Sequence, residues 1–62
     1  MLVETIIRNN KIVEKRNIFN ATLEDMIKKI EADRPYIALI DRGRTYIIAE
    51  YMNGKIRIIE EL

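Results

Sequence analysis

The chain has 62 residues, no cysteine, no histidine and a net charge of +1 from 11 basic and 10 acidic residues. A domain of this length buries only about 60% of its unfolded surface, so it is marginally stable without a disulfide, a metal or a partner subunit. The missing residues exclude disulfides and the usual zinc ligand sets, and the near-neutral charge is unlike that of most non-specific nucleic-acid binders. We therefore expect one domain over residues 1–62 that is supported by a partner subunit.

The composition also bears on the source and the compartment of the protein. Thirteen residues are Ile, 34% are charged, and Ser, Gln and Trp are missing. This usage indicates a hyperthermophilic source, archaeal or viral, although five Asn and three Met argue mildly against it. Glu4 and Arg8 interrupt the only apolar stretch near the start, so neither a signal peptide nor a membrane span is predicted. We expect a cytoplasmic protein.

Residues 2–8 ("LVETIIR") and 11–17 ("KIVEKRN") have the composition of two strands joined by Asn9 and Asn10. Asn tolerates positive φ better than any residue except Gly, so the pair predicts a two-residue hairpin turn. That turn would pair Ile7 with Ile12, Ile6 with Val13 and Glu4 with Lys15. The mixed, charged sides favour an exposed edge of a sheet.

The next segment, "NATLEDMIKKIEADRPY", has the spacing of an amphipathic helix. Its apolar positions fall at i, i+3, i+4 and i+7, namely Leu23, Met26, Ile27 and Ile30. Thr22 and Asp25 resemble a capping box, and Asn20 is an alternative N-cap. Pro35 ends the helix, because the residue before a proline is disfavoured in the α region.

Three more strands follow, over Tyr36–Asp41, Thr45–Met52 and Lys55–Glu61. The first is apolar on both sides, as in a strand that is buried on both faces. Asn53-Gly54 between the last two is the strongest short hairpin signal. The element order predicts an α+β fold, ββαβββ, with an antiparallel sheet and one helix packed on one of its faces.

The predicted register of the last hairpin decides which side chains face the helix. A two-residue loop would pair Glu50 with Arg57, Ala49 with Ile58 and Ile48 with Ile59. A three-residue bulged loop would oppose Glu50 to Ile56, and the two-residue loop is favoured because it keeps that face apolar. The face away from the helix then carries six apolar side chains, namely Ile37, Leu39, Tyr46, Ile48, Met52 and Ile59.

Monomers rarely leave contiguous apolar patches of several hundred Å² exposed. The patch formed by these six side chains could be covered by a second copy, by the N-terminal hairpin folded over the sheet, or by a different protein. Turning the hairpin inward would bury its charges at a cost in desolvation. Self-association is therefore favoured, and the same six residues are the predicted oligomer interface.

Without His, Cys and Ser, the usual nucleophile and base constellations cannot form, so we expect no enzyme, no cofactor and no metal site. The leading hypothesis is a small non-enzymatic interaction or regulatory module that acts as a homodimer or higher oligomer. The alternative is a nucleic-acid-binding protein, because arginine at an exposed turn can hold a phosphate. Its contacts would be the basic residues at two turns, Arg8, Lys11, Arg42 and Arg44, although a solvated turn with Arg44 paired to Asp41 explains the latter two more simply.

Overall fold

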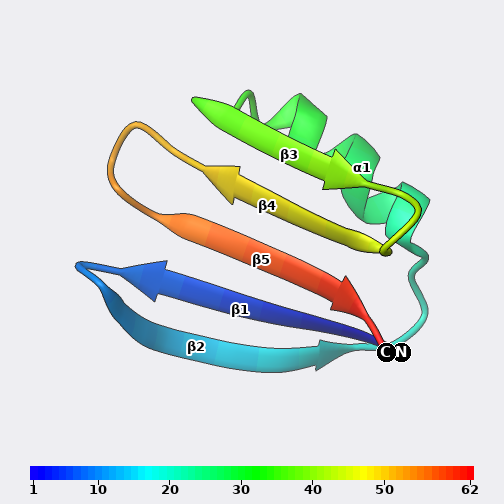
Figure 1. The fold of residues 1–62 in the computed structure, drawn as a ribbon. Coiled ribbons are helices and arrows are strands. Elements are labelled where there is room, and N and C mark those ends of the chain that lie inside the picture. The colour runs from blue at the N-terminus through cyan, green and yellow to red at the C-terminus, as the bar shows by residue number, and fades with distance from the viewer.

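The computed structural model describes residues 1–62 as one five-stranded antiparallel sheet with a single helix behind it (Figure 1). The strands lie in the order β2-β1-β5-β4-β3. The elements are β1 (Leu2–Arg8), β2 (Lys11–Ile18), α1 (Leu23–Ala32), β3 (Ile37–Asp41), β4 (Tyr46–Glu50) and β5 (Ile56–Glu61). The predicted ββαβββ order and α+β class are confirmed.

The first hairpin turns at Asn9 and Asn10, whose φ angles of 51° and 62° lie in the left-handed region that a two-residue hairpin turn needs. Ile7 pairs with Ile12 as predicted. Val13 is an extra residue in β2, a β-bulge, so the pairing shifts by one beyond it. The predicted Ile6–Val13 and Glu4–Lys15 pairs are therefore wrong.

Because of the bulge, Ile6 pairs with Glu14 and Glu4 pairs with Arg16. A buried carboxylate needs a cation, and this register supplies one from the neighbouring strand. The hairpin lies in the sheet, with β2 as its edge strand, so it does not fold over the face away from the helix.

The helix begins where its capping residues predict. Thr22 is the N-cap, its Oγ1 accepts a hydrogen bond from Asp25 N (3.2 Å), and Asp25 Oδ2 accepts one from Thr22 N (2.9 Å). Asn20 is not the cap, and it lies in the preceding link with a φ of 52°. At ten residues, α1 is too short to cross a lipid bilayer, and no other helix is present.

The core lies between α1 and the face of the sheet that the helix covers. All four residues of the predicted helix stripe are buried, and they pack against residues of β1, β4 and β5. The cluster consists of Leu2, Leu23, Met26, Ile27, Ile30, Ile47, Ala49 and Ile59. Since side chains alternate along a strand, the residues between these on each strand lie on the face that the helix does not cover.

The last hairpin contradicts the predicted register. Tyr51 N donates to Lys55 O (2.9 Å) and Gly54 N donates to Tyr51 O (3.0 Å), so the loop has three residues, with Gly54 at a φ of 85°. Glu50 therefore pairs with Ile56, and Ile48 with Ile58, so the two-residue turn and the Glu50–Arg57 pair were both wrong.

The three-residue loop is favoured because of the residues that it places on the helix side of the sheet. It pairs Ile47 with Ile59 and Ala49 with Arg57 on that face. Ile47 and Ile59 then complete the core with no exposed surface, and Arg57 reaches Glu4. The free energy gained by filling the core and by pairing the buried carboxylate outweighs the local preference of Asn-Gly for a two-residue turn.

Candidate interaction surface

The face of the sheet away from α1, here the open face, is built from three rows of side chains that run across all five strands. In strand order from β2 to β3, the terminal row holds Asn17, Val3, Glu60, Tyr46 and Asp41. The middle row holds Lys15, Thr5, Ile58, Ile48 and Leu39. The tip row, nearest the Asn9-Asn10 turn, holds Ile12, Ile7, Ile56, Glu50 and Ile37.

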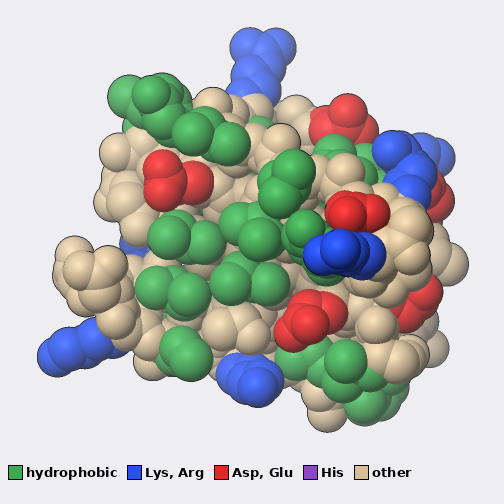
Figure 2. Space-filling view, viewed as in Figure 1, with side chains coloured by type: hydrophobic (Ala, Val, Ile, Leu, Met, Phe, Trp, Pro, Cys, Tyr) green, Lys and Arg blue, Asp and Glu red, His purple; other side chains and the backbone are tan.

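The middle and tip rows form a continuous apolar patch. Seven of their ten side chains are Ile or Leu, and the exceptions are Lys15, Thr5 and Glu50. Ile12, Ile37 and Leu39 are 65%, 55% and 51% exposed. Figure 2 shows apolar side chains gathered over the middle of this face, with charged side chains around them. No element of the chain covers the patch.

Four of the six predicted interface residues lie on the open face, namely Ile37, Leu39, Tyr46 and Ile48. The placement of Ile59 was wrong, because its side chain is fully buried against α1. Met52 lies in the β4–β5 loop rather than on a strand, and it is 83% exposed.

The prediction missed four apolar residues of the open face, Ile7, Ile12, Ile56 and Ile58. The first two were assigned to a charged edge hairpin, and the last two were assigned to the helix face by the wrong register. The Ile7–Ile12 pair, which the Asn9-Asn10 turn fixes, was the available signal that the apolar face extends into the first hairpin.

Two charged residues interrupt the patch, and neither has an ionic partner within the chain. Lys15 occupies the β2 end of the middle row, and Glu50 lies on β4 in the tip row. Every ion pair in the structure is made by other residues. Burial of this face would therefore require a partner that brings a charge to each of them.

The opposite face holds a buried carboxylate that the sequence did not reveal. Glu4 is 1% exposed, and its oxygens accept hydrogen bonds from Arg57 Nε (2.8 Å) and Arg16 Nε (2.7 Å). Arg57 also donates to Asp33 Oδ2 (3.2 Å). Burial alone would raise the pKa of Glu4, but the hydrogen bonds and charges of Arg57 and Arg16 outweigh it and hold that pKa below its ordinary value. Glu4 is therefore ionised at neutral pH.

The four basic residues of the nucleic-acid hypothesis do not lie together. Arg8 and Lys11 flank the β1–β2 turn, and Arg42 and Arg44 lie in the β3–β4 turn at the opposite end of the sheet (Figure 1). Arg42 Nε donates to Glu24 Oε1 (2.9 Å), so that guanidinium already has an anionic partner. The Asp41 carboxylate accepts from the backbone N of Arg44 (3.0 Å) rather than from its guanidinium.

Comparison with known protein families, with curated proteins and with solved structures found no match for this chain. Its function is therefore inferred from its own residues, and the open face is the largest feature that the fold leaves unexplained.

Proposed function

We propose that the protein is a small non-enzymatic interaction or regulatory module that acts as a homodimer, in which the open faces of two copies pack against each other. The observation that carries this proposal is the apolar patch of the middle and tip rows, which has no cover within the chain. The helix lies on the other face, and the first hairpin extends the patch instead of covering it. A second copy brings a surface of the same size and character.

The small core of the single chain also favours association. Only 10 of its 62 residues are buried. Full burial of a large aliphatic side chain stabilises a protein by about 1.5–3 kcal/mol, so burying several on the open face is a large gain for so small a domain. Two sheets pack face to face at about 10 Å, a spacing that side chains of the size of Ile fill well.

The rows of the open face select one of the two ways in which identical sheets can pack. A two-fold axis that runs along the strands places each row over the same row of the second copy, so the apolar rows meet each other. An axis across the strands would instead place the terminal row over the tip row, and Glu60 would then face Ile56. We therefore choose the axis that runs along the strands.

The same axis places the β2 edge of one copy over the β3 edge of the other. Lys15 then lies over Leu39 of the second copy, from where its long side chain can extend to Asp41 two residues along β3 or to Glu50 on the neighbouring strand. Two equivalent Lys15–carboxylate contacts result, one on each side of the axis. Glu60 faces its own counterpart, but it is exposed in the terminal row, where solvent and salt screen the repulsion.

The test compares two substitutions that add the same charge at two apolar positions. Ile48→Lys places an ammonium group in the middle row, where burial without a partner is costly, so the dimer should dissociate. Met52→Lys places it in the β4–β5 loop, outside the patch, so the dimer should persist. Light scattering and circular dichroism would report mass and folding together.

The proposal fails if the parent chain is monomeric, or if Met52→Lys dissociates the dimer while Ile48→Lys leaves it intact. The second outcome would move the interface from the open face to the loop end of the sheet.

A further inference from the structure

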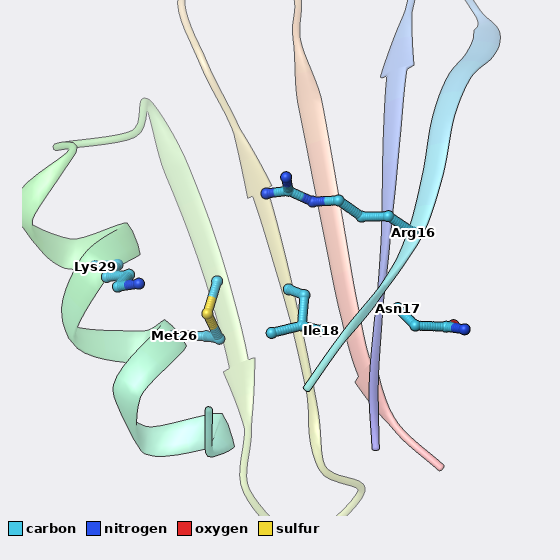
Figure 3. A pocket seen from close by; sticks show the side chains of 5 residues that line it. All are labelled: Arg16, Asn17, Ile18, Met26 and Lys29. Atoms are coloured by element: carbon cyan, nitrogen blue, oxygen red, sulfur yellow. The ribbon is translucent and has the colours of Figure 1, made fainter. Parts of the chain in front are cut away.

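A groove of about 280 Å³ lies on the helix side of the sheet, between α1 and β2, and it is separate from the open face (Figure 3). It exists because β2, the edge strand, extends the sheet beyond the strands that carry the buried core. Its lining has two cations and no carboxylate, and it consists of Arg16, Asn17, Ile18, Met26 and Lys29. Figure 3 shows Arg16 extending from β2 towards the helix and Lys29 extending from α1 towards the sheet.

The buried carboxylate of Glu4 holds the Arg16 guanidinium in place. Its Nε donates to Glu4 Oε1 (2.7 Å), and Glu4 is itself fixed by Arg57 on its other oxygen. The two terminal nitrogens of Arg16 make no hydrogen bond in the structure, so they are free to donate to a bound group. Lys29 makes no ion pair, and its ammonium is likewise free.

We propose that this groove binds a small organic carboxylate that carries a short aliphatic chain. The carboxylate oxygens would accept hydrogen bonds from Arg16 and Lys29, a pairing that planar guanidinium geometry favours. The chain would lie against Ile18 and Met26, which supply the apolar part of the lining. The Asn17 side chain points away from the helix and contributes no polar contact to the ligand (Figure 3).

The charges around the groove suit a monoanion better than phosphate. The charge of Arg16 is already shared with Glu4 and with Glu14, whose Oε2 lies 3.6 Å from Arg16 Nε. Those carboxylates oppose a second negative charge in the groove, while one negative charge balances what Arg16 and Lys29 leave uncompensated.

The test is a titration of the 15N-labelled protein with hexanoate, followed by NMR, with hexanol and inorganic phosphate as comparison ligands. Saturable shifts at the amides of Ile18, Met26 and Lys29 are expected with hexanoate, with weaker effects from the other two ligands. Hexanol lacks the charge, and phosphate lacks the chain.

Two variants of the same helix sharpen the test. Lys29→Gln should weaken hexanoate binding about fivefold, which corresponds to the loss of one exposed ion pair. Lys28→Gln makes the same change in net charge at a position outside the groove, and binding should be unchanged.

The proposal is overturned if no saturable shift appears up to about 50 mM hexanoate, a range that covers weak millimolar binding. It is also overturned if hexanol or phosphate binds as tightly as hexanoate, or if both variants weaken binding equally. The last result would show a general effect of charge rather than a site.

Discussion

The two faces of the central strands carry the same residue type in different surroundings. On β5, Ile59 is fully buried against the helix, while its neighbour Ile58 lies half-buried on the open face. On β4, Ile47 is fully buried and Ile48 is its half-buried counterpart. Because isoleucine occupies both faces, apolar content does not identify the core face here. The register of the hairpin decides which face is the core face, and no element of the chain covers the other one.

The two faces also differ in whether their charged side chains have partners within the chain. On the helix side, Glu4 is buried but receives hydrogen bonds from two arginines. On the open face, Lys15 and Glu50 interrupt the apolar patch, and neither has an ionic partner in the chain. The helix-side face is complete within one chain, whereas the open face has both apolar surface and charges that a second copy would satisfy.

The largest expected effect separates the two faces with adjacent residues of β5. Ile59→Lys places an ammonium group in the core, opposite Glu4, whose oxygens already accept hydrogen bonds from two arginines. The cost of burying this extra charge should exceed the stability of so small a domain and unfold the protein. Ile58→Lys should leave a folded monomer, or a chain that folds only at higher concentration. Circular dichroism and light scattering on both variants distinguish these outcomes. If Ile58→Lys unfolded the chain and Ile59→Lys did not, the assignment of faces would be reversed.

The second effect concerns the buried carboxylate. Glu4→Gln removes the anion that compensates Arg57, whose side chain is only 12% exposed, so the free energy of unfolding should fall by about 3–5 kcal/mol at neutral pH. Glu50→Gln is the matched change on the open face, and it should affect the folding of a single chain far less. Urea unfolding of the two variants and the parent would measure both values.

The pKa of Glu4 also gives a prediction for how stability depends on pH. The pKa of Glu4 is lowered in the folded state from its ordinary value of 4.5, so its stabilising contribution is complete above pH 4.5 and is lost as the pH falls through the lower folded value. The Glu4→Gln variant lacks this contribution and should lose less stability than the parent between neutral pH and about pH 3. Asp25, whose pKa is lowered by its hydrogen bonds with Thr22, titrates in both proteins and cancels in the comparison. Equal losses in the two proteins would mean that Glu4 is not paired in the folded state.

A smaller effect tests the orientation of the proposed dimer. Lys15→Glu and Glu50→Lys each remove one side of the proposed intersubunit contact and should each weaken association. The double variant restores opposite charges and should recover most of the loss, since a coupling of this kind appears only between residues in contact. Additive losses in the double variant would contradict the axis that runs along the strands.

The smallest effect is expected at the turns. Arg42→Gln removes an exposed ion pair with Glu24 and should change stability by about 0–1 kcal/mol. If Arg8, Lys11, Arg42 and Arg44 bind nucleic acid, a mobility-shift assay at low salt should show a complex that this variant weakens. No complex at tens of micromolar protein would retire that hypothesis.

The sequence predicted features that depend on local patterns. The helix stripe, the Thr22–Asp25 cap and the Asn9-Asn10 turn follow from spacing and φ preference, and all three are confirmed. The number of residues in the β1–β2 bulge and in the β4–β5 loop did not follow from such patterns. The bulge at Val13 and the third residue of the β4–β5 loop each shift a strand pairing by one.

Each shift had a consequence for a site. The longer loop places Ile59 in the core and Ile58 on the open face, and the bulge places Arg16 opposite Glu4. The groove beside Arg16 could not be predicted, because without the bulge Arg16 would have pointed to the other face. The loop allows the core to be filled, and the bulge allows Glu4 to be paired. Both depend on contacts between residues far apart in the chain, so a local sequence pattern does not predict them.

The most direct test of the central claim is the mass of the parent protein as a function of concentration, measured by sedimentation equilibrium together with the melting temperature. If a second copy covers the open face, the mass should approach twice the 7.4 kDa of one chain, and the melting temperature should rise with protein concentration. A mass of 7.4 kDa up to about 100 μM, with a melting temperature that does not depend on concentration, would contradict the proposed homodimer.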